Sequence, residues 1–348
     1  MNINLNDIVL TPIENSVKRL KISDDEYFSK KYRSYISNSR LKYINPDQEG
    51  CPSLYKDGIK QETTRSLALG SAIHECFLQS DEFSLAPDLN RPSAKLGLVC
   101  DEIIKNRKAG QTIYNAIVNA CLTVDYYTTN IASNYKRIRQ IIEKGLYYYL
   151  ESKTINPEKQ IILSSRDREI CANCLESLNS NKTITNLIRP VDLFGDPIDS
   201  FNEDALFIDV KCTYGKKSTI LRLKMKADNW TIDKDNKTVV LNDLKTSSKP
   251  LGFFMQDYGS FVKFHYARQF GMYMWILKYL CKKEFKANNT WRYFANVIVV
   301  ETSCENKAGL FRVSRNMIKE GENEFIRLLK QVGYCEINGY DDSINFVE

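Results

Sequence analysis

The pattern of hydrophobic and polar positions divides the chain into an irregular start, a helical middle and a last part that contains strands. Residues 1 to about 65 are polar, and only short helical pieces separated by loops are expected there. A helix is predicted from Glu62 onward, in ETTRSLALGSAIHECFLQSDEF, because its apolar residues recur at helical spacing. Residues 95–188 are predicted to be mainly helical.

Strand-like segments begin after the turn signals around Pro197. Three of them, ALFIDVKCTY, STILRLKMKADNW and KTVVLNDLKT, predict a three-stranded meander. A long apolar helix is expected in QDYGSFVKFHYARQFGMYMWILKYL, and a closing helix in MIKEGENEFIRLLKQV. Between these helices, NVIVVET is predicted to be a buried strand and LFRVS an edge strand. This order of elements predicts a mixed α/β sandwich.

The hairpin between the second and third of these strands brings candidate chemistry together. If its turn is centred on Asp235 and Asn236, Asp228 lies directly opposite Asp243. Like charges in that position destabilise a bare hairpin, whereas a hard divalent cation with oxygen ligands would relieve the repulsion. Lys245 shares a face with Asp243 because side chains alternate along a strand. A bulge would shift the pairing by one residue and turn the carboxylates apart.

Two further pairs of residues have helical spacing. His74 follows Gly70 by one turn, on or near an apolar helix face, and is either a core histidine or a ligand. Gly70 would let another backbone or a substrate approach closely. Gln269 and Tyr273 lie one above the other on the later helix, either as a surface glutamine with a core tyrosine or as part of a site.

Composition and charge exclude few classes of protein. A formal charge of +6 over 348 residues permits nucleic acid as a partner without demanding it. No apolar run reaches 18 residues and no signal-peptide pattern opens the chain, so we expect no membrane segment and a cytoplasmic location. The ten cysteines are expected to be buried hydrophobes, including the pair Cys171 and Cys174, which no second pair completes as a zinc set.

Taken in order, these motifs resemble the PD-(D/E)XK nuclease superfamily, and are most similar to the RecE-type exonucleases (exonuclease VIII) and their RecB-like relatives. The matching motifs are G-x-x-x-H at Gly70 and His74, the hairpin with Asp228, D-L-K-T from Asp243 to Thr246, and Q-x-x-x-Y at Gln269 and Tyr273. The resemblance spans roughly residues 30–330.

The resemblance implies an α/β fold with a restriction-endonuclease-like core, in which helices flank a mixed central sheet. We expect an N-terminal arm at 1–65 and a nuclease domain at 66–348. Within that domain we expect a mainly helical insertion at about 90–190 and a catalytic core at about 200–330.

The resemblance also implies a site that binds Mg²⁺ or Mn²⁺. The implied metal ligands are His74, Asp228, Asp243 and the carbonyl of Leu244. Lys245 would polarise the attacking water or the scissile phosphate, and Gln269 and Tyr273 would border the site. The sequence departs from the family pattern at Ala227, where proline is frequent. It also leaves the acidic residue of the first strand open among Glu203, Asp204 and Asp209.

The implied function is a metal-dependent DNA exonuclease that acts on duplex ends and serves recombination and single-strand annealing, with a phage or prophage origin. Its implied partners are DNA, a single-strand annealing protein and further copies of the chain. The alternatives are a catalytically silent DNA-binding scaffold with this fold and a PD-(D/E)XK endonuclease. Some RecB-like relatives carry an iron–sulfur cluster, but Cys281, Cys304 and Cys335 are too dispersed to match, so we predict none here.

Overall fold

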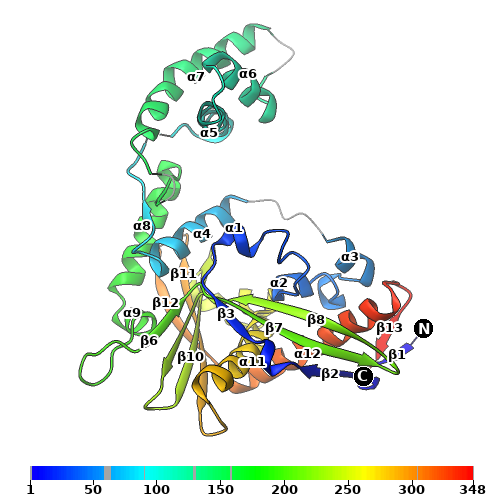
Figure 1. Cartoon of the computed structure of the whole chain (residues 1–348). Coiled ribbons are helices and arrows are strands. Elements are labelled where there is room, and N and C mark those ends of the chain that lie inside the picture. The colour runs from blue at the N-terminus through cyan, green and yellow to red at the C-terminus, as the bar shows by residue number, and fades with distance from the viewer. Residues whose placement is uncertain are drawn as a thin grey trace. The chain divides into compact units, whose positions relative to one another are not determined.

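The computed structural model describes residues 2–58, 64–89, 91–127, 131–156, 159–303 and 305–347, so Glu62 and Cys304 of the expectations above lie outside the described residues. The chain forms two compact units. The first contains Met1–Thr63 together with Ser177–Glu348, and the second contains Thr64–Glu176 (Figure 1).

The first unit is built on two groups of strands. One has the order β12 (Ala308–Val313), β11 (Arg292–Glu301), β10 (Thr238–Ser247), β9 (Asn229–Asp233) and β6 (Asp199–Asn202). The other has the order β2 (Ile8–Pro12), β7 (Ala205–Tyr214) and β3 (Lys18–Leu20), with β8 (Lys217–Lys226) also paired to β7. The buried strand and the edge strand expected from NVIVVET and LFRVS are confirmed as β11 and β12.

The predicted meander is wrong in one respect, because its second strand bends and contributes to both groups. The chain leaves β8 at Lys226 and enters β9 at Asn229. Alongside it, β6 ends at Asn202 and β7 begins at Ala205. Asn202 pairs with Asn229 and Ala205 pairs with Lys226, so the antiparallel register is the same on both sides of the bend. A single twisted ribbon therefore passes from one group of strands to the other.

Two long helices, α11 (Tyr266–Phe285) and α12 (Arg315–Asn338), pack against each other and share the main core with the strands. Their close approach depends on glycine. A Cβ added at Gly321 would lie 1.8 Å from the carbonyl oxygen of Ala267, and one at Gly271 would lie 2.2 Å from the nitrogen of Glu322. The short helix α10 (Ser260–Lys263) precedes α11, and His265 between them has a left-handed backbone with φ of 53°.

The N-terminal segment, expected to be an arm at 1–65, pairs with strands from later in the chain. Strands β2 and β3 pair with β7, and β1 (Asn2–Asn4) pairs in parallel with β13 (Asn345–Val347), which brings the two chain ends side by side (Figure 1). The helices of this segment are α1 (Asp24–Tyr27), α2 (Asn38–Leu41) and α3 (Pro52–Asp57). Strands of three to five residues are too short to show a clear alternation of apolar and polar residues. They are stabilised by pairing with strands that are distant in sequence, so a local pattern does not predict them.

The second unit is mainly helical. It contains α4 (Arg65–Leu78), α5 (Ala94–Lys108), α6 (Ile113–Thr123) and α7 (Ile131–Ser152), with β4 (Ser84–Leu85) paired to β5 (Gln160–Ile161). Helix α8 (Ser165–Ser180) begins in this unit and leads to α9 (Lys182–Ile188) of the first unit. Cys171 and Cys174 are fully buried, as expected of core cysteines. The unit differs from the expected insertion at about 90–190 because it includes α4.

The mixed α/β class is confirmed by the sheets and helices together. Within the described ranges, every helix is either too short or too polar to cross a membrane.

Candidate active site

Three acidic residues lie in neighbouring segments of the first unit: Glu203 follows β6, Asp228 precedes β9 and Asp243 lies on β10. The hairpin of β9 and β10 has the predicted register, since Asp233 pairs with Thr238 and Asn229 with Asn242. One residue further along, Asp228 faces Asp243. On its other side Asp228 faces Glu203, whose peptide N–H donates to the Asp228 carbonyl at 3.2 Å. Glu203, Asp228 and Asp243 thus form a carboxylate row across the bend.

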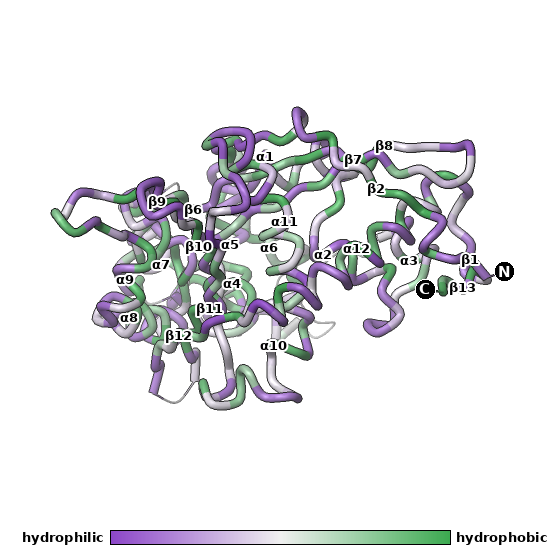
Figure 2. Tube along the Cα trace, turned by 90° about the horizontal axis from the view of Figure 1, so that it is seen from below, coloured by the Kyte–Doolittle hydropathy of each residue, from purple (hydrophilic) through white to green (hydrophobic). Residues whose placement is uncertain are grey.

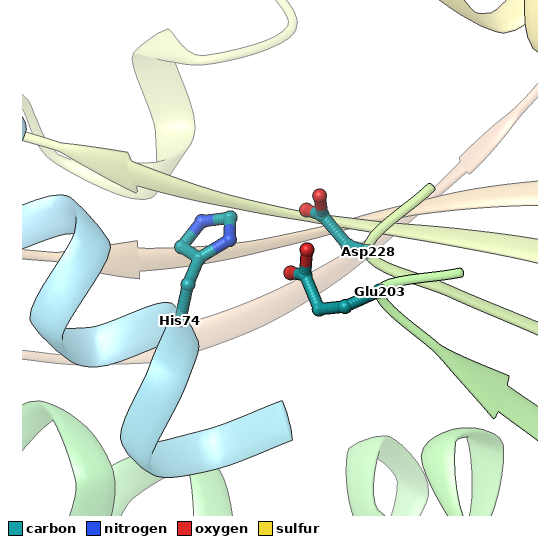
Figure 3. Close-up of side chains that lie close together, drawn as sticks. All are labelled: His74, Glu203 and Asp228. Carbon is teal, nitrogen blue, oxygen red and sulfur yellow. The ribbon is translucent and has the colours of Figure 1, made fainter. Parts of the chain in front are cut away.

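The carboxylates of Glu203 and Asp228 lie close together in this row. Their carboxylate oxygens lie within 4.8 Å of each other, and Figure 3 draws both side chains together with His74. Glu203 has a left-handed backbone, with φ of 57°, at the point where the ribbon bends. Burial and the charge of Asp228 raise the pKa of Glu203 to about 7, and burial also raises the pKa of Asp228. Two adjacent, partly buried carboxylates suit a hard divalent cation.

A lysine pairs with Glu203 on one side of the row. The Nζ of Lys226 lies 3.0 Å from Oε2 of Glu203 and also pairs with Asp24, in the first turn of α1. Burial opposes the charge of Lys226, but its carboxylate partners prevail and raise its pKa. The ion pair therefore connects the N-terminal segment to the carboxylate row.

Asp243 has a different environment at the other end of the row. Its side chain is almost fully buried, Oδ1 accepts a hydrogen bond from Nε2 of Gln269 at 2.6 Å, and Oδ2 pairs with Nζ of Lys245. Burial disfavours the charge of Lys245, yet Asp243 and Asp228 outweigh it and raise its pKa. Lys245 also donates to the carbonyl of Leu244 at 3.5 Å. Hydrogen bonds and an ion pair thus connect the predicted residues Asp243, Leu244, Lys245 and Gln269 in one group.

The backbone between Asp243 and Lys245 also fixes Asp228. The N–H of Leu244 donates to Oδ2 of Asp228 at 2.6 Å, which joins the carboxylate row across the hairpin. Tyr273, one turn after Gln269 on α11, is partly buried. Burial raises its pKa well above the usual value, and the nearby charges of Asp243, Asp228 and Glu203 add to this effect.

His74, the remaining predicted ligand, lies on α4 of the second unit. Its side chain is partly buried, one helical turn after Gly70. Its imidazole can offer one nitrogen to a metal.

The structure distinguishes the three candidates for the acidic residue of the first strand. Asp204 pairs with Arg19 at 3.6 Å, and Asp209 lies within β7, opposite Arg222. Glu203 is the candidate that lies beside Asp228. Sequence alone left this open because the bend that turns Glu203 toward Asp228 has no local pattern.

A buried ladder of asparagines runs next to the carboxylate row, and sequence reasoning missed it. Nδ2 of Asn229 donates to Asn202, Nδ2 of Asn242 to Asn229, and Nδ2 of Asn296 to Asn242, at 2.8–2.9 Å. These residues pair across β6, β9, β10 and β11. Each bond requires one strand register, so the ladder aligns the neighbouring acidic residues. An asparagine beside an acidic residue in three segments was the available signal.

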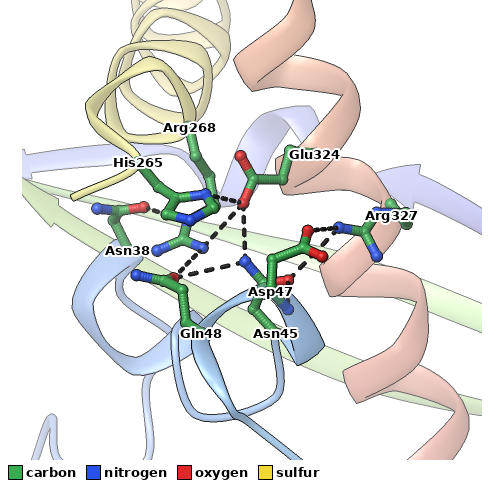
Figure 4. A network of polar contacts seen from close by, with 8 residues as sticks. All are labelled: Asn38, Asn45, Asp47, Gln48, His265, Arg268, Glu324 and Arg327. Carbon is green, nitrogen blue, oxygen red and sulfur yellow. Dashed lines mark hydrogen bonds and ion pairs between the residues drawn. The ribbon is translucent and has the colours of Figure 1, made fainter. Parts of the chain in front are cut away.

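A second polar network fixes the start of α11, the helix that carries Gln269 and Tyr273 (Figure 4). The guanidinium of the buried Arg268 donates to Asn38 at 2.9 Å, to Gln48 at 2.8 Å and to Glu324 of α12 at 3.1 Å. Nδ1 of His265 lies 2.9 Å from the same Glu324 oxygen. The network joins the N-terminal segment, α11 and α12.

Comparisons with known proteins add little. No protein-family model matches the chain, and no curated protein matches it. Among solved structures, the chain is similar to one from Eubacterium rectale described as a “Putative exonuclease”. The identity is 11% and the TM-score 0.41, over 90% of this chain and 88% of that chain. A likeness this distant carries no argument about function.

Proposed function

We propose that this protein is a metal-dependent DNA exonuclease of the RecE type, which hydrolyses phosphodiester bonds of duplex DNA from the ends. The observation that carries the proposal is the carboxylate row of Glu203, Asp228 and Asp243 with Lys245 at its end. Packing alone gives no reason to align three acidic side chains, since like charges on opposed strands are destabilising. A cation and a phosphodiester substrate would use all four groups.

In this proposal Glu203 and Asp228 hold Mg²⁺ or Mn²⁺. His74 supplies a nitrogen ligand, and Asp243 and the Leu244 carbonyl complete the set. Such a donor set, rich in oxygen with one imidazole, suits Mg²⁺ and Mn²⁺. A bound divalent cation supplies positive charge at the phosphate and an activated water for its hydrolysis.

The other residues act on charge and position. Lys245 presents a positive charge next to the carboxylate row and stabilises the negative charge that develops on the phosphate. Gln269 holds Asp243 through its amide, and the Tyr273 hydroxyl borders the site. The network around Arg268 keeps α11, and with it both side chains, in place.

The biological setting is proposed from the family resemblance. Double-stranded DNA ends are the substrate, a single-strand annealing protein is a partner, and copies of the chain assemble with each other. The protein would act in the cytoplasm of a bacterial or phage-infected cell.

The test is incubation with linear and closed circular duplex DNA, with and without Mg²⁺ or Mn²⁺. We expect nucleotide release from linear DNA alone, and only with metal. Lys245→Ala should lower the rate by about 10²–10³, the usual loss when a group that stabilises transition-state charge is removed. Asp228→Asn should lose both metal binding and activity, whereas Asp209→Asn is a matched control that should retain them.

Other outcomes point elsewhere. Cleavage of closed circles would indicate an endonuclease. Binding of DNA without cleavage by any of these proteins would indicate a silent scaffold. Equal activity of wild type and Lys245→Ala would contradict the assigned role of the lysine.

A further inference from the structure

Two exposed aromatic side chains of the first unit are connected to the carboxylate row through neighbouring residues. Phe28 follows α1 and is 69% exposed, and Phe264 lies between α10 and α11 and is 50% exposed. Figure 2 shows α1 and α10 on opposite sides of α11, the helix that borders the site. A large exposed aromatic ring gains nothing from the core, so its position beside a site invites a functional explanation.

Phe28 is connected to the Glu203 side of the row. Its ring packs edge-on against Tyr27, with 5.0 Å between ring centroids. Burial raises the pKa of Tyr27, and the charges of Asp24 and Glu203 add to this effect. The ion pairs from Asp24 through Lys226 to Glu203 hold α1 in this position.

Phe264 is connected to the Lys245 side. Its ring lies 5.9 Å from that of Tyr266, and the Nζ of Lys245 lies 5.2 Å from the centre of the Tyr266 ring. Phe264 is therefore separated from Lys245 by one aromatic ring.

Both rings have basic neighbours. Lys30, Lys31 and Arg33 follow Phe28 and are exposed, and the Nζ of Lys263 lies 5.7 Å from the centre of the Phe264 ring. Aromatic rings next to cations are how proteins bind single-stranded nucleic acid, because bases stack on the rings and cations contact the backbone.

The same unit contains a contrasting exposed phenylalanine. Phe194 is 91% exposed, but its loop carries Asp192 and Asp196. Its N–H donates to Asp192 at 2.8 Å, as part of a turn. Residues 191–198 contain no lysine or arginine that could contact a phosphate backbone, so exposure alone does not define the feature.

We propose that Phe28 and Phe264 form two stacking positions for the bases of an unpaired DNA strand that flank the phosphodiester at the carboxylate row. This inference rests on the proposed function, and it specifies how the protein would bind the DNA strand that it cleaves. Stacking accepts any base, so the positions would bind DNA without sequence preference. A duplex end would have to unpair locally to reach them.

The test measures binding rather than cleavage. Fluorescence anisotropy follows a labelled oligothymidine of about 12 nucleotides, within the range that such proteins bind, in EDTA so that no metal-dependent cleavage occurs. Phe28→Ala and Phe264→Ala should each weaken binding by about fivefold or more, the lower end of what one stacked base contributes. Phe264→Tyr should bind like wild type, and Phe264→Leu should bind like Phe264→Ala, since leucine keeps the apolar bulk without a ring face.

Phe194→Ala is the matched control and should leave the dissociation constant within twofold of wild type. The proposal is overturned if wild type does not bind the oligonucleotide, or if both alanine variants bind as wild type does. It is also overturned if the variants change the oligomeric state instead, which would make these rings a contact between copies. If the alanine variants bind more weakly but wild type never cleaves DNA, the stacking positions are supported and the nuclease proposal is rejected. If wild type cleaves DNA but the alanine variants bind as it does, the nuclease proposal is supported and the stacking positions are rejected.

Discussion

Two lysines on the same strand, β8, have opposite electrostatic environments. Lys226 is stabilised by Asp24 and Glu203, which raise its pKa. Lys224 is buried and donates to the carbonyl of Tyr27 at 2.8 Å, with its Nζ 4.1 Å from the centre of the Tyr27 ring. Burial, with a smaller effect of Arg40, lowers the pKa of Lys224 to about 8. Burying the charged ammonium of Lys224 at neutral pH therefore lowers the free energy of unfolding, whereas the carboxylate partners of Lys226 offset the same effect there.

This difference predicts a pH dependence of stability. The pKa of lysine in an unfolded chain is about 10.4, so between about pH 8 and pH 10 the unfolded chain binds more protons at Lys224 than the folded one. The free energy of unfolding of wild type should therefore rise with pH relative to that of Lys224→Met. Urea unfolding of both proteins across this range measures the difference. If the difference in free energy of unfolding between the two proteins stays constant with pH, the buried charge of Lys224 does not destabilise the folded state.

At the scale of elements, the bent ribbon and the asparagine ladder together align the acidic residues. The bend turns Glu203 toward Asp228, and the ladder permits one register across the strands that carry the row. Side-chain amides are costly to bury unless both ends are paired, so a ladder of this kind specifies register more than it adds stability.

Asn242 is bonded on both sides within the ladder, so its substitution measures how much the ladder contributes to stability. Asn242→Ala removes the donor to Asn229 and the acceptor for Asn296, and each buried group left unpaired costs about 1–3 kcal/mol. The free energy of unfolding should therefore fall by about 2–6 kcal/mol. Asn296→Ala, which removes only the donor to Asn242, should cost less. Urea denaturation measures both, and a loss for Asn242→Ala no larger than for Asn296→Ala would contradict the ladder's role.

At the scale of the whole molecule, one carboxylate row joins segments that are distant in sequence. Glu203 follows β6, Asp228 precedes β9 and Asp243 lies on β10, and the ion pair of Lys226 with Asp24 adds the N-terminal segment. A cation bound to the row would therefore stabilise the folded chain and have little affinity for the unfolded one.

Metal should therefore raise the melting temperature of wild type. A ligand that binds only the folded state adds about 2.7 kcal/mol at a hundred times its dissociation constant. Without metal, Asp228→Asn should melt at a higher temperature than wild type, because it relieves repulsion by Glu203 and Asp243. With Mn²⁺ the order should reverse. Differential scanning calorimetry with EDTA and with Mn²⁺ tests this, and an equal Mn²⁺ response in both proteins would place the metal elsewhere.

The sequence by itself determined the features that depend on local pattern. Helical spacing predicted α11 and α12, an apolar run predicted β11, and the polar turn at Asp235 and Asn236 predicted the register of the β9–β10 hairpin. These features follow from contacts between near neighbours, so a short stretch of residues carries the information.

Only the tertiary structure decided the features that depend on distant contacts. It divided one predicted strand into β8 and β9, placed Glu203 rather than Asp204 or Asp209 beside Asp228, and paired β2 and β3 with β7. None of these has a local pattern, because a bend in a ribbon or a strand of three residues is stabilised by partners elsewhere in the chain. The carboxylate row depends on both sources, since periodicity places Asp228 opposite Asp243 and the bend brings Glu203 beside them.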